Sequence, residues 1–197
     1  MKIGIFGGTF DPPHIGHMNL AQSALAHLEL DEIIWMPTFQ NPLKVKNRAT
    51  PGKDRLEMVK LATADHPNMA VSDAEVSRRG PSYTVDTLSE LQFVRPADYW
   101  FILGSDSLKT LPQWKQPERL LRLCRIAAAV RPPVNPVEAL LLLPPHFRDR
   151  IDLFEMNPVE ISATEIRNNV ARGRSIEPWV SKPVIKYIQD NKLYRLK

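Results

Sequence analysis

The chain has a single cysteine, Cys124, among 197 residues. One thiol cannot form an internal disulfide, and it lacks the clustered ligand spacing that a zinc site needs. No apolar stretch reaches the length of a membrane-spanning helix, and the apolar run at the N-terminus is too short for a signal peptide. We therefore expect a cytoplasmic protein in a reducing compartment, with no membrane partner.

Glycine is scarce as well, and its spacing excludes two familiar phosphate-binding loops. No G-x-G-x-x-G pattern runs through the eight glycines, and none begins the Gly-Lys-Ser/Thr sequence of a P-loop. These absences argue against a dehydrogenase and against a P-loop ATPase. Internal repeats and low-complexity tracts are missing too.

A basic stripe interleaved with stacking aromatics is also missing. The net charge is +4 and the sequence pI is about 9.3, a balance that suits small polyanionic substrates as well as nucleic acid. Basic residues cluster in only two places, a loop with Lys44, Lys46 and Arg48 and a helical stretch with Arg167, Arg172 and Arg174. We therefore do not expect nucleic acid as a partner.

Short apolar runs alternate with helical patterns, which is typical of a parallel sheet wrapped by helices. The predicted strands are Lys2–Phe6, Glu32–Pro37, Met69–Asp73, Tyr99–Gly104, Arg125–Val130 and Ile151–Glu155. The predicted helices cover Met18 to Leu28, a segment from near Pro51, Tyr83 to Val94 and Pro117 to Leu123. We predict an α/β, Rossmann-like, doubly wound and mostly parallel sheet with helices on both faces. Residues 1–197 form one domain in this prediction, with a small helical part over about 160–197.

Three further segments have sequence patterns that predict their local structure. Thr38–Lys53 has little periodicity and several basic residues, so we expect a long surface loop that is mobile until a ligand arrives. Leu140–Leu143 is interpreted as a buried helix turn. The run from Ile161 to Arg167 predicts a helix start with a Ser-x-x-Glu capping box and an apolar staple, and Gly173 is a suitable helix stop.

The most informative segment is GGTFDPPHIGH, from Gly7 to His17, between a predicted strand and a helix. Backbone N–H groups at a helix start have no partner within the helix, and the helix dipole favours anions there. The imidazoles of His14 and His17 can donate hydrogen bonds to phosphate oxygens, and protonation would strengthen those bonds. Gly7 and Gly8 allow a ligand to approach the backbone, and Gly16 leaves room for a base or sugar. A tight turn with two partly exposed histidines, or a pair of metal ligands, is the alternative.

Several segments together resemble the bacterial nicotinate-nucleotide adenylyltransferases, members of the nucleotidyltransferase superfamily with an HxGH motif. They are the segment just described, SYTVDTL from Ser82, GSDS from Gly104, LPxW from Leu111, ISxTxIR from Ile161, and the terminal Tyr187-Ile188 and Leu193-Tyr194. The resemblance implies adenylyl transfer from ATP to nicotinate mononucleotide, giving nicotinate adenine dinucleotide and pyrophosphate in NAD biosynthesis, with Mg²⁺. The attacking group is an ionised phosphate, so alignment and charge neutralisation should suffice without a general base.

The resemblance also implies roles for individual residues. The catalytic set is His14, His17, Lys44 and Arg167, with His17 nearest the reacting phosphorus. The ATP-binding set is Gly7, Gly8, Thr9, Phe10, Gly16, Gly104, Asp106, Ser162 and Thr164. The nicotinate-nucleotide set is Trp114, stacked on the pyridine ring, with the backbone amides of Thr84 and Lys115 on the carboxylate. No residue is assigned as a protein ligand of the metal, although Asp106 is expected to hold a ribose or the metal, and Asp11 is expected to be structural.

Each assignment has a simpler alternative. Trp114 could be a core tryptophan, Asp106 a helix cap, Ser162 a capping residue alone, and Lys44 a solvated charge. The sequence also departs from many relatives, with Leu43 in place of a loop histidine and Ala163 in place of a second serine. Alternative functions are adenylyl transfer to nicotinamide mononucleotide or another small molecule, such as phosphopantetheine, and non-catalytic binding of a nucleotide or nucleic acid. A homo-oligomer stays open.

Overall fold

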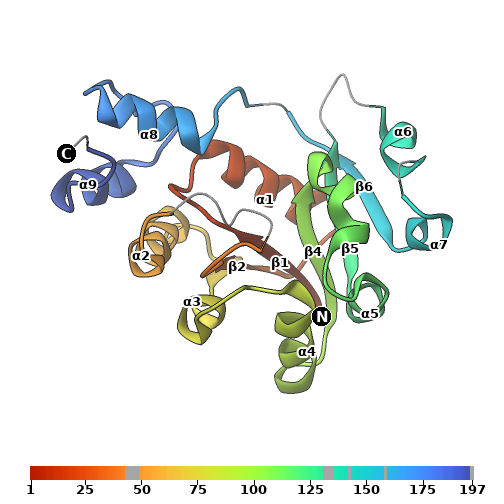
Figure 1. Cartoon of the computed structure of the whole chain (residues 1–197). Coiled ribbons are helices and arrows are strands. Elements are labelled where there is room, and N and C mark those ends of the chain that lie inside the picture. Colours follow the sequence, from red (N-terminus) through yellow and green to blue (C-terminus); the bar gives the residue numbers. More distant parts are fainter. Residues whose placement is uncertain (43–48, 131–134, 142, 158, 196–197) are drawn as a thin grey trace.

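The computed structural model describes residues 1–42, 49–130, 135–141, 143–157 and 159–195. Its strands form one six-stranded parallel sheet of order β3-β2-β1-β4-β5-β6 (Figure 1). The strands are β1 (Lys2–Gly8), β2 (Glu32–Pro37), β3 (Met69–Val71), β4 (Asp98–Gly104), β5 (Arg125–Val130) and β6 (Ile151–Glu155). The strand order reverses between β1 and β4, and ligands bind at such a switch point, outside the carboxyl ends of the strands.

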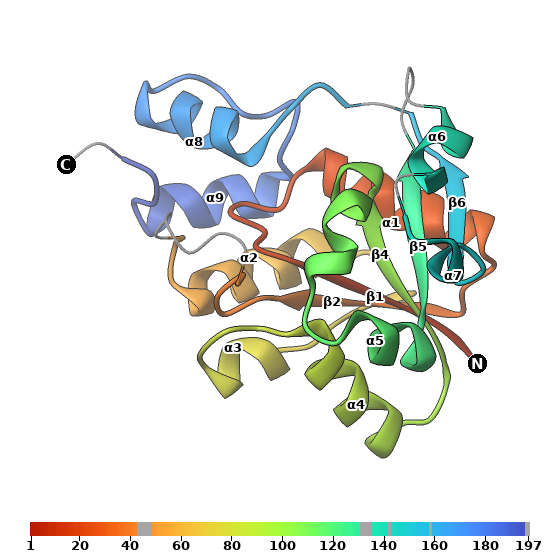
Figure 2. The same cartoon turned by 45° about the vertical axis from the view of Figure 1, so that its right-hand side comes forward.

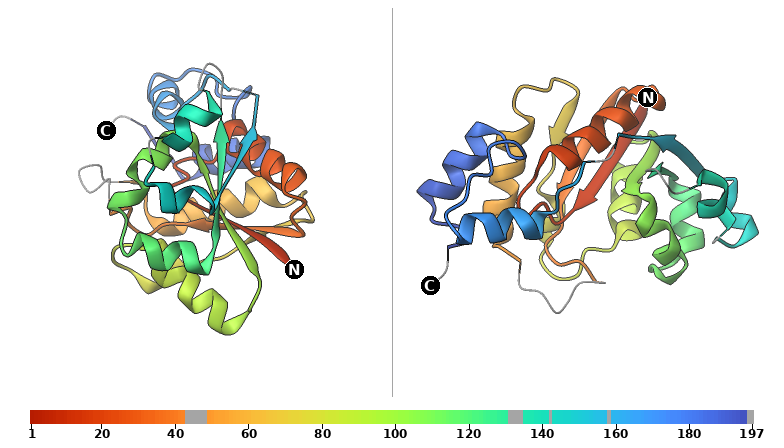
Figure 3. Two further views of the ribbon diagram at one scale, coloured as in Figure 1. Left: turned by 90° about the vertical axis from the view of Figure 1, so that its right-hand side faces the viewer. Right: turned by 90° about the horizontal axis from the view of Figure 1, so that it is seen from above.

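The helices lie on both faces of this sheet (Figures 2 and 3). They are α1 (Ile15–His27), α2 (Gly52–Thr63), α3 (Ala74–Arg78), α4 (Thr84–Val94), the 3₁₀ helix η1 (Ser105–Gln113), α5 (Pro117–Leu123), α6 (Pro136–Leu141), α7 (Pro145–Arg148), α8 (Ala163–Ala171) and α9 (Lys182–Asp190). Buried side chains of α1 and α2 share one apolar cluster with the sheet, whereas those of α4, α5 and η1 share another. This arrangement confirms the predicted Rossmann-like α/β fold.

Strand β1 shows how the sequence builds both layers. Successive side chains of a strand point to opposite faces of the sheet. Accordingly, Ile3 and Ile5 belong to the cluster under α4 and α5, while Phe6 belongs to the cluster under α1. A strand that is buried on both faces needs an almost continuous apolar run, which explains why the predicted strands could be found as such runs.

The C-terminal helices α8 and α9 form a third apolar cluster. Ile166 of α8 and Val184 and Ile188 of α9 pack with Met58 of α2, and all four side chains are at most 2% exposed. The hydroxyl of Tyr187 on α9 also donates to the Asp54 carboxylate of α2 at 2.9 Å. The C-terminal segment is therefore attached to the sheet through α2.

Some predicted boundaries differ from the structure. β1 extends to Gly8, two residues beyond the predicted end, and β3 ends at Val71 rather than at residue 73. The interpretation of Leu140–Leu143 as a buried helix turn is wrong, because Leu141 is 59% exposed while Leu143 is buried. The reason is that α6 is a single short helix, which cannot turn all of its adjacent leucines inward. Within the described ranges, no helix is long and apolar enough to cross a membrane.

Candidate active site

The segment between β1 and α1 ends in a capping box made by two histidines. His14 is the N-cap residue of α1, and its Nδ1 accepts a hydrogen bond from the backbone N–H of Gly16 at 3.2 Å. His17 lies three residues later, and its Nδ1 accepts from the backbone N–H of His14 at 3.2 Å. Reciprocal bonds of this kind are usually made by Ser or Thr with Glu or Gln. Here the imidazoles take both places.

This capping changes the expected role of the helix start. The N–H of Ile15 donates to the carbonyl oxygen of Trp179 at 2.8 Å, and the N–H groups of His17 and Met18 donate to the carbonyl oxygen of His14. With the Gly16 bond, the first amides of α1 all have partners inside the protein. The expectation that free amides of this helix hold phosphate is therefore wrong, because the His14 imidazole and the carbonyl oxygens of His14 and Trp179 already satisfy them.

The capping bonds fix how the two rings can donate. Because Nδ1 of each ring accepts a hydrogen bond, a neutral ring carries its proton on Nε2. The ring centroids of His14 and His17 are 3.8 Å apart, with an angle of 36° between the planes. Burial lowers the pKa of His14 to about 4, so this ring is neutral at pH 7. The predicted gain from protonation therefore does not apply to His14 at that pH.

Aromatic side chains support His17 from the core. Its ring makes an edge-to-face contact with Phe10 at a centroid distance of 5.1 Å, and it lies 6.1 Å from Phe6. Phe10 is only 2% exposed and has a φ of 50°, so its side chain belongs to the core. The predicted contact of Phe10 with the nucleotide is thus limited to its backbone.

The glycines of this segment are needed for packing within the site. A Cβ at Gly8 would lie 2.8 Å from the Phe10 ring, and one at Gly7 would lie 2.9 Å from the Phe101 ring. At Gly16 an added Cβ would lie 3.0 Å from Cε1 of the His14 ring. Without a Cβ at these positions, the rings of His14 and Phe10 can keep the places they occupy. This packing explains the glycines more directly than the approach of a ligand does.

Asp11 joins the segment to distant parts of the chain. Its carboxylate accepts from the Tyr194 hydroxyl at 2.7 Å and from the backbone N–H of Thr50 at 3.1 Å. Its carbonyl oxygen accepts from the Arg167 guanidinium at 2.7 Å. These bonds agree with the structural role expected for Asp11, and they bring Arg167 of α8 beside the histidine segment.

Arg55 is a buried guanidinium that sequence reasoning missed. It is 1% exposed and donates to the carbonyl oxygens of Thr9 and Thr50, at 2.8 Å each, and of Phe39 at 3.3 Å. Burial lowers its pKa, and the negative charge of Asp11 opposes that effect. No local pattern marks this arginine, since its partners lie outside its own helix.

The start of α8 has the predicted capping box. The Ser162 hydroxyl accepts from the N–H of Glu165 at 3.2 Å, and the Glu165 carboxylate accepts from the N–H of Ser162 at 2.9 Å. The same hydroxyl donates to the carboxylate at 2.7 Å, so the capping box already uses its proton. Arg167 also donates to the Thr164 hydroxyl at 3.1 Å, which links Thr164 to the histidine segment through the guanidinium.

The predicted nicotinate residues gather between α4 and η1. The Lys115 ammonium pairs with the Asp86 carboxylate in the first turn of α4 at 2.7 Å and lies 4.4 Å from the centre of the Tyr83 ring. Thr84 is the first residue of the same helix. Trp114 is partly buried; its ring packs edge-to-face on Phe101 at 5.6 Å, and its Nε1 donates to the hydroxyl of residue 110 at 3.1 Å.

Asp106 and Gly104 lie at the carboxyl end of β4, as predicted. Gly104 ends the strand and is the N-cap of η1, while Asp106 is exposed in the first turn. Asp106 is therefore not the N-cap residue of this helix. Lys44 lies outside the described residues. Among the residues with described positions, no group of three or more His, Cys, Asp or Glu could hold a metal ion.

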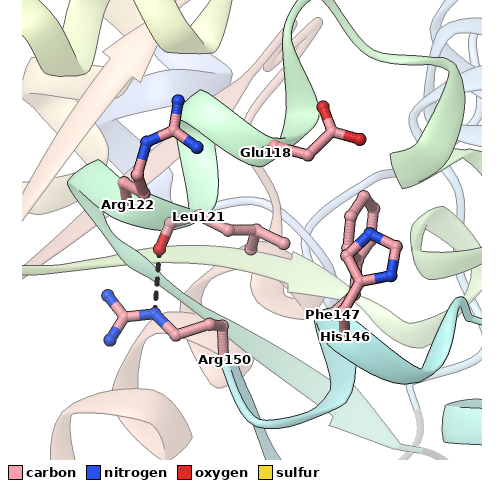
Figure 4. A pocket seen from close by; sticks show the side chains of 6 residues that line it. All are labelled: Glu118, Leu121, Arg122, His146, Phe147 and Arg150. Atoms are coloured by element: carbon pink, nitrogen blue, oxygen red, sulfur yellow. Dashed lines mark hydrogen bonds between the residues drawn. The ribbon is translucent and has the colours of Figure 1, made fainter.

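Two hollows lie away from most of these residues. One of about 480 Å³ lies between α5 and α7 and is lined by Glu118, Leu121, Arg122, His146, Phe147 and Arg150 (Figure 4). In it, Nε of Arg150 donates to the Leu121 carbonyl oxygen at 2.8 Å. The other, of about 290 Å³, lies behind the start of α1 and includes His14 and Trp179 in its lining. Because His14 alone of the predicted site residues lines either hollow, neither one defines the candidate site.

A family model described as cytidylyltransferase-like matches residues 5–169. A probable nicotinate-nucleotide adenylyltransferase of Dehalococcoides mccartyi (strain CBDB1) is 40% identical, and the match covers 98% of this chain and 97% of that protein. One of Roseiflexus sp. (strain RS-1) is also 40% identical, with 98% of each chain covered.

Solved structures share the fold. The Plasmodium falciparum nicotinic acid mononucleotide adenylyltransferase complexed with NaAD has a TM-score of 0.79 and 21% identity, covering 98% of this chain and 97% of that chain. A putative nicotinate-nucleotide adenylyltransferase from Vibrio parahaemolyticus has a TM-score of 0.65 and 20% identity, covering 100% and 96%. At these identities the likeness concerns the fold alone.

Proposed function

Because the chain belongs to the nicotinate-nucleotide adenylyltransferases of the cytidylyltransferase-like family, we propose that the histidine capping box binds the triphosphate of ATP during catalysis. The reaction is adenylyl transfer from ATP to nicotinate mononucleotide, which forms nicotinate adenine dinucleotide and pyrophosphate.

One observation carries the proposed mechanism: Nδ1 of both His14 and His17 is occupied by a backbone N–H. This leaves Nε2–H as the donor of each neutral ring. Donors that are already oriented stabilise the charge that develops at phosphorus without reorganising during the reaction, and loss of one such donor typically costs about 10²–10³ in turnover. Arg167, tied to the Asp11 carbonyl oxygen, would add positive charge beside them.

The attacking phosphate needs alignment rather than deprotonation. Good alignment alone can supply about 7–11 kcal/mol of the barrier. We propose that Trp114 stacks on the pyridine ring and that backbone amides at Thr84 and Lys115 bind the carboxylate. The Lys115–Asp86 ion pair supports this assignment, because it keeps residue 115 beside the first turn of α4. The start of a helix also favours an anion.

We further propose that Mg²⁺ comes to the site with ATP. Mg²⁺ is usually held by substrate phosphates, waters and one or two carboxylates, and it would neutralise charge on the phosphates of this substrate. Such binding needs no cluster of protein ligands, so it fits the donors that the described residues offer. Asp106, exposed at the end of β4, is the carboxylate best placed in sequence and fold to contribute.

Two substitutions at His17 test this mechanism. His17→Ala removes both the imidazole and the capping bond, whereas His17→Gln keeps a side-chain acceptor at the position where a capping box uses Gln. We expect both variants to lose at least about a hundred-fold in turnover, but only His17→Ala to lose about 0.5–2 kcal/mol of stability.

The assay follows dinucleotide and pyrophosphate formation from ATP, Mg²⁺ and either nicotinate or nicotinamide mononucleotide. Faster turnover of the acid is expected. Equal or reversed rates for the amide would overturn the substrate assignment. A folded His17→Gln variant with normal turnover would remove His17 from the mechanism.

A further inference from the structure

Glu75 on α3 is a buried carboxyl that none of the roles above uses. It is 6% exposed, and its Oε1 accepts a hydrogen bond from the Thr87 hydroxyl of α4 at 2.8 Å. Its Oε2 has no partner with good hydrogen-bond geometry among the residues that the structure describes, although the Ser82 hydroxyl is near enough to influence the carboxyl. A buried charged carboxylate with one oxygen unpartnered is unfavourable, so this environment favours the uncharged acid.

Among the described residues, no charged group forms a direct ion pair with Glu75. Arg78 of α3 donates to the Thr87 hydroxyl at 3.2 Å and to the Glu90 carboxylate of α4 at 3.0 Å. Burial raises the pKa of Glu75; the hydroxyls of Thr87 and Ser82 and the charge of Arg78 act to lower it, and Glu90 acts to raise it. The net direction is upward, in agreement with the unpartnered oxygen.

Glu75 acts on the segment that leads into α4. Thr84 and Thr87 are three residues apart in this helix and therefore lie on the same face. Upstream, the Ser82 N–H donates to the Gln40 carbonyl oxygen at 2.9 Å, and the Ser82 hydroxyl accepts from the Phe39 N–H at 3.1 Å. Two contacts therefore hold the start of α4. The residues that follow β2 bind the segment just before the helix, and Glu75 binds its first turn through Thr87.

We propose that Glu75 is a positioning residue whose buried carboxyl holds the first turn of α4, through Thr87, in the position that binds the substrate carboxylate. The inference deepens the proposed function and rests on it. An ionised Glu75 would place a negative charge one helix turn from that site and oppose the field of the helix start. Binding of the acid substrate should therefore weaken as Glu75 ionises.

The test compares wild type with Glu75→Gln, which stays uncharged, and with Glu75→Ala, which loses the bond to Thr87. The matched control is Glu90→Gln, which removes an exposed carboxylate from the same network. KM for nicotinate mononucleotide and KM for ATP are measured between pH 5.5 and 8.5. Ratios to Glu75→Gln cancel the titration of the substrate and of other groups.

We divide each KM of wild type by the same KM of Glu75→Gln. The ratio for nicotinate mononucleotide should rise with pH, while the ratio for ATP should stay constant. Glu75→Ala should raise KM for the mononucleotide about tenfold at every pH, which corresponds to about 1.4 kcal/mol. Glu90→Gln should also show a ratio that rises with pH, with the rise displaced to lower pH because Glu90 acts to raise the pKa of Glu75. A flat ratio, or equal effects on both substrates, would overturn the role of Glu75. Wild type that forms no dinucleotide would instead refute the proposed function, and this inference with it.

Discussion

Acid should destabilise this protein through His14. The pKa of His14 is lowered from 6.5 to about 4 by burial in the folded chain, whereas the unfolded chain keeps an ordinary value. Between these values the unfolded chain binds a proton that the folded chain does not. The contribution to stability is therefore complete above pH 6.5 and is lost as the pH falls towards 4.

The size of the effect follows from the same two values. Linkage gives a loss of at most about 2 kcal/mol between pH 7 and pH 5. The physical cause is local, because Nδ1 of His14 accepts the Gly16 N–H and a protonated ring has no acceptor left. Protonation thus removes the N-cap of α1 and also charges a partly buried ring.

Substitution of His14 by asparagine isolates the effect of the imidazole. His14→Asn keeps a side-chain acceptor that is favoured at the N-cap, and it does not titrate. Urea unfolding at pH 7 and pH 5 should show a loss of stability that is about 2 kcal/mol smaller in His14→Asn than in wild type. His146→Asn, which changes an exposed histidine on α7, should retain the wild-type loss. An equal loss in wild type and His14→Asn would refute the argument.

Two further predictions concern Tyr194 and Trp114. Tyr194→Phe removes the 2.7 Å bond to the Asp11 carboxylate, so the free energy of unfolding should fall by about 1.5–3 kcal/mol in denaturant titrations; an unchanged value would contradict the bond. Trp114→Leu should raise KM for nicotinate mononucleotide about tenfold and leave KM for ATP unchanged, because stacking is worth about 0.5–1.5 kcal/mol beyond area burial. Trp114→Phe should keep most of the affinity, and a parallel rise in both KM values would assign Trp114 to the core alone.

The elements that could be predicted are those with local signals. β2 and β5 have the predicted boundaries because strands buried on both faces are apolar runs with clear ends. The boundaries of β6 are also as predicted, although this edge strand is only partly buried. The start of α8 could be predicted because all parts of a capping box lie within four residues. The stop at Gly173 has a φ of 67°, a conformation that glycine adopts without steric cost.

The contacts that join the site could not be predicted in this way. Tyr194 is 183 positions from Asp11, and Arg55 is 46 positions from Thr9. No periodicity relates such pairs, and their meeting depends on the packing of whole helices. The same holds for Glu75, whose partner Thr87 belongs to another helix. Distant polar pairs of this kind determine the site after the fold is formed.

The helix start at His14 shows a different kind of error, since its amides were assigned to phosphate although a capping signal was present. His14-x-x-His17 has the spacing of a capping box, and imidazole Nδ1 is an acceptor that can replace a hydroxyl or carboxylate. General reasoning about helix starts assigned phosphate to the amides, yet two imidazoles satisfy two of these amides, and in the proposed mechanism the Nε2–H groups of the rings are the donors. Such donors act while the rings are neutral, so phosphate binding through His14 should persist well above pH 6.5, where protonated histidines would have lost their charge.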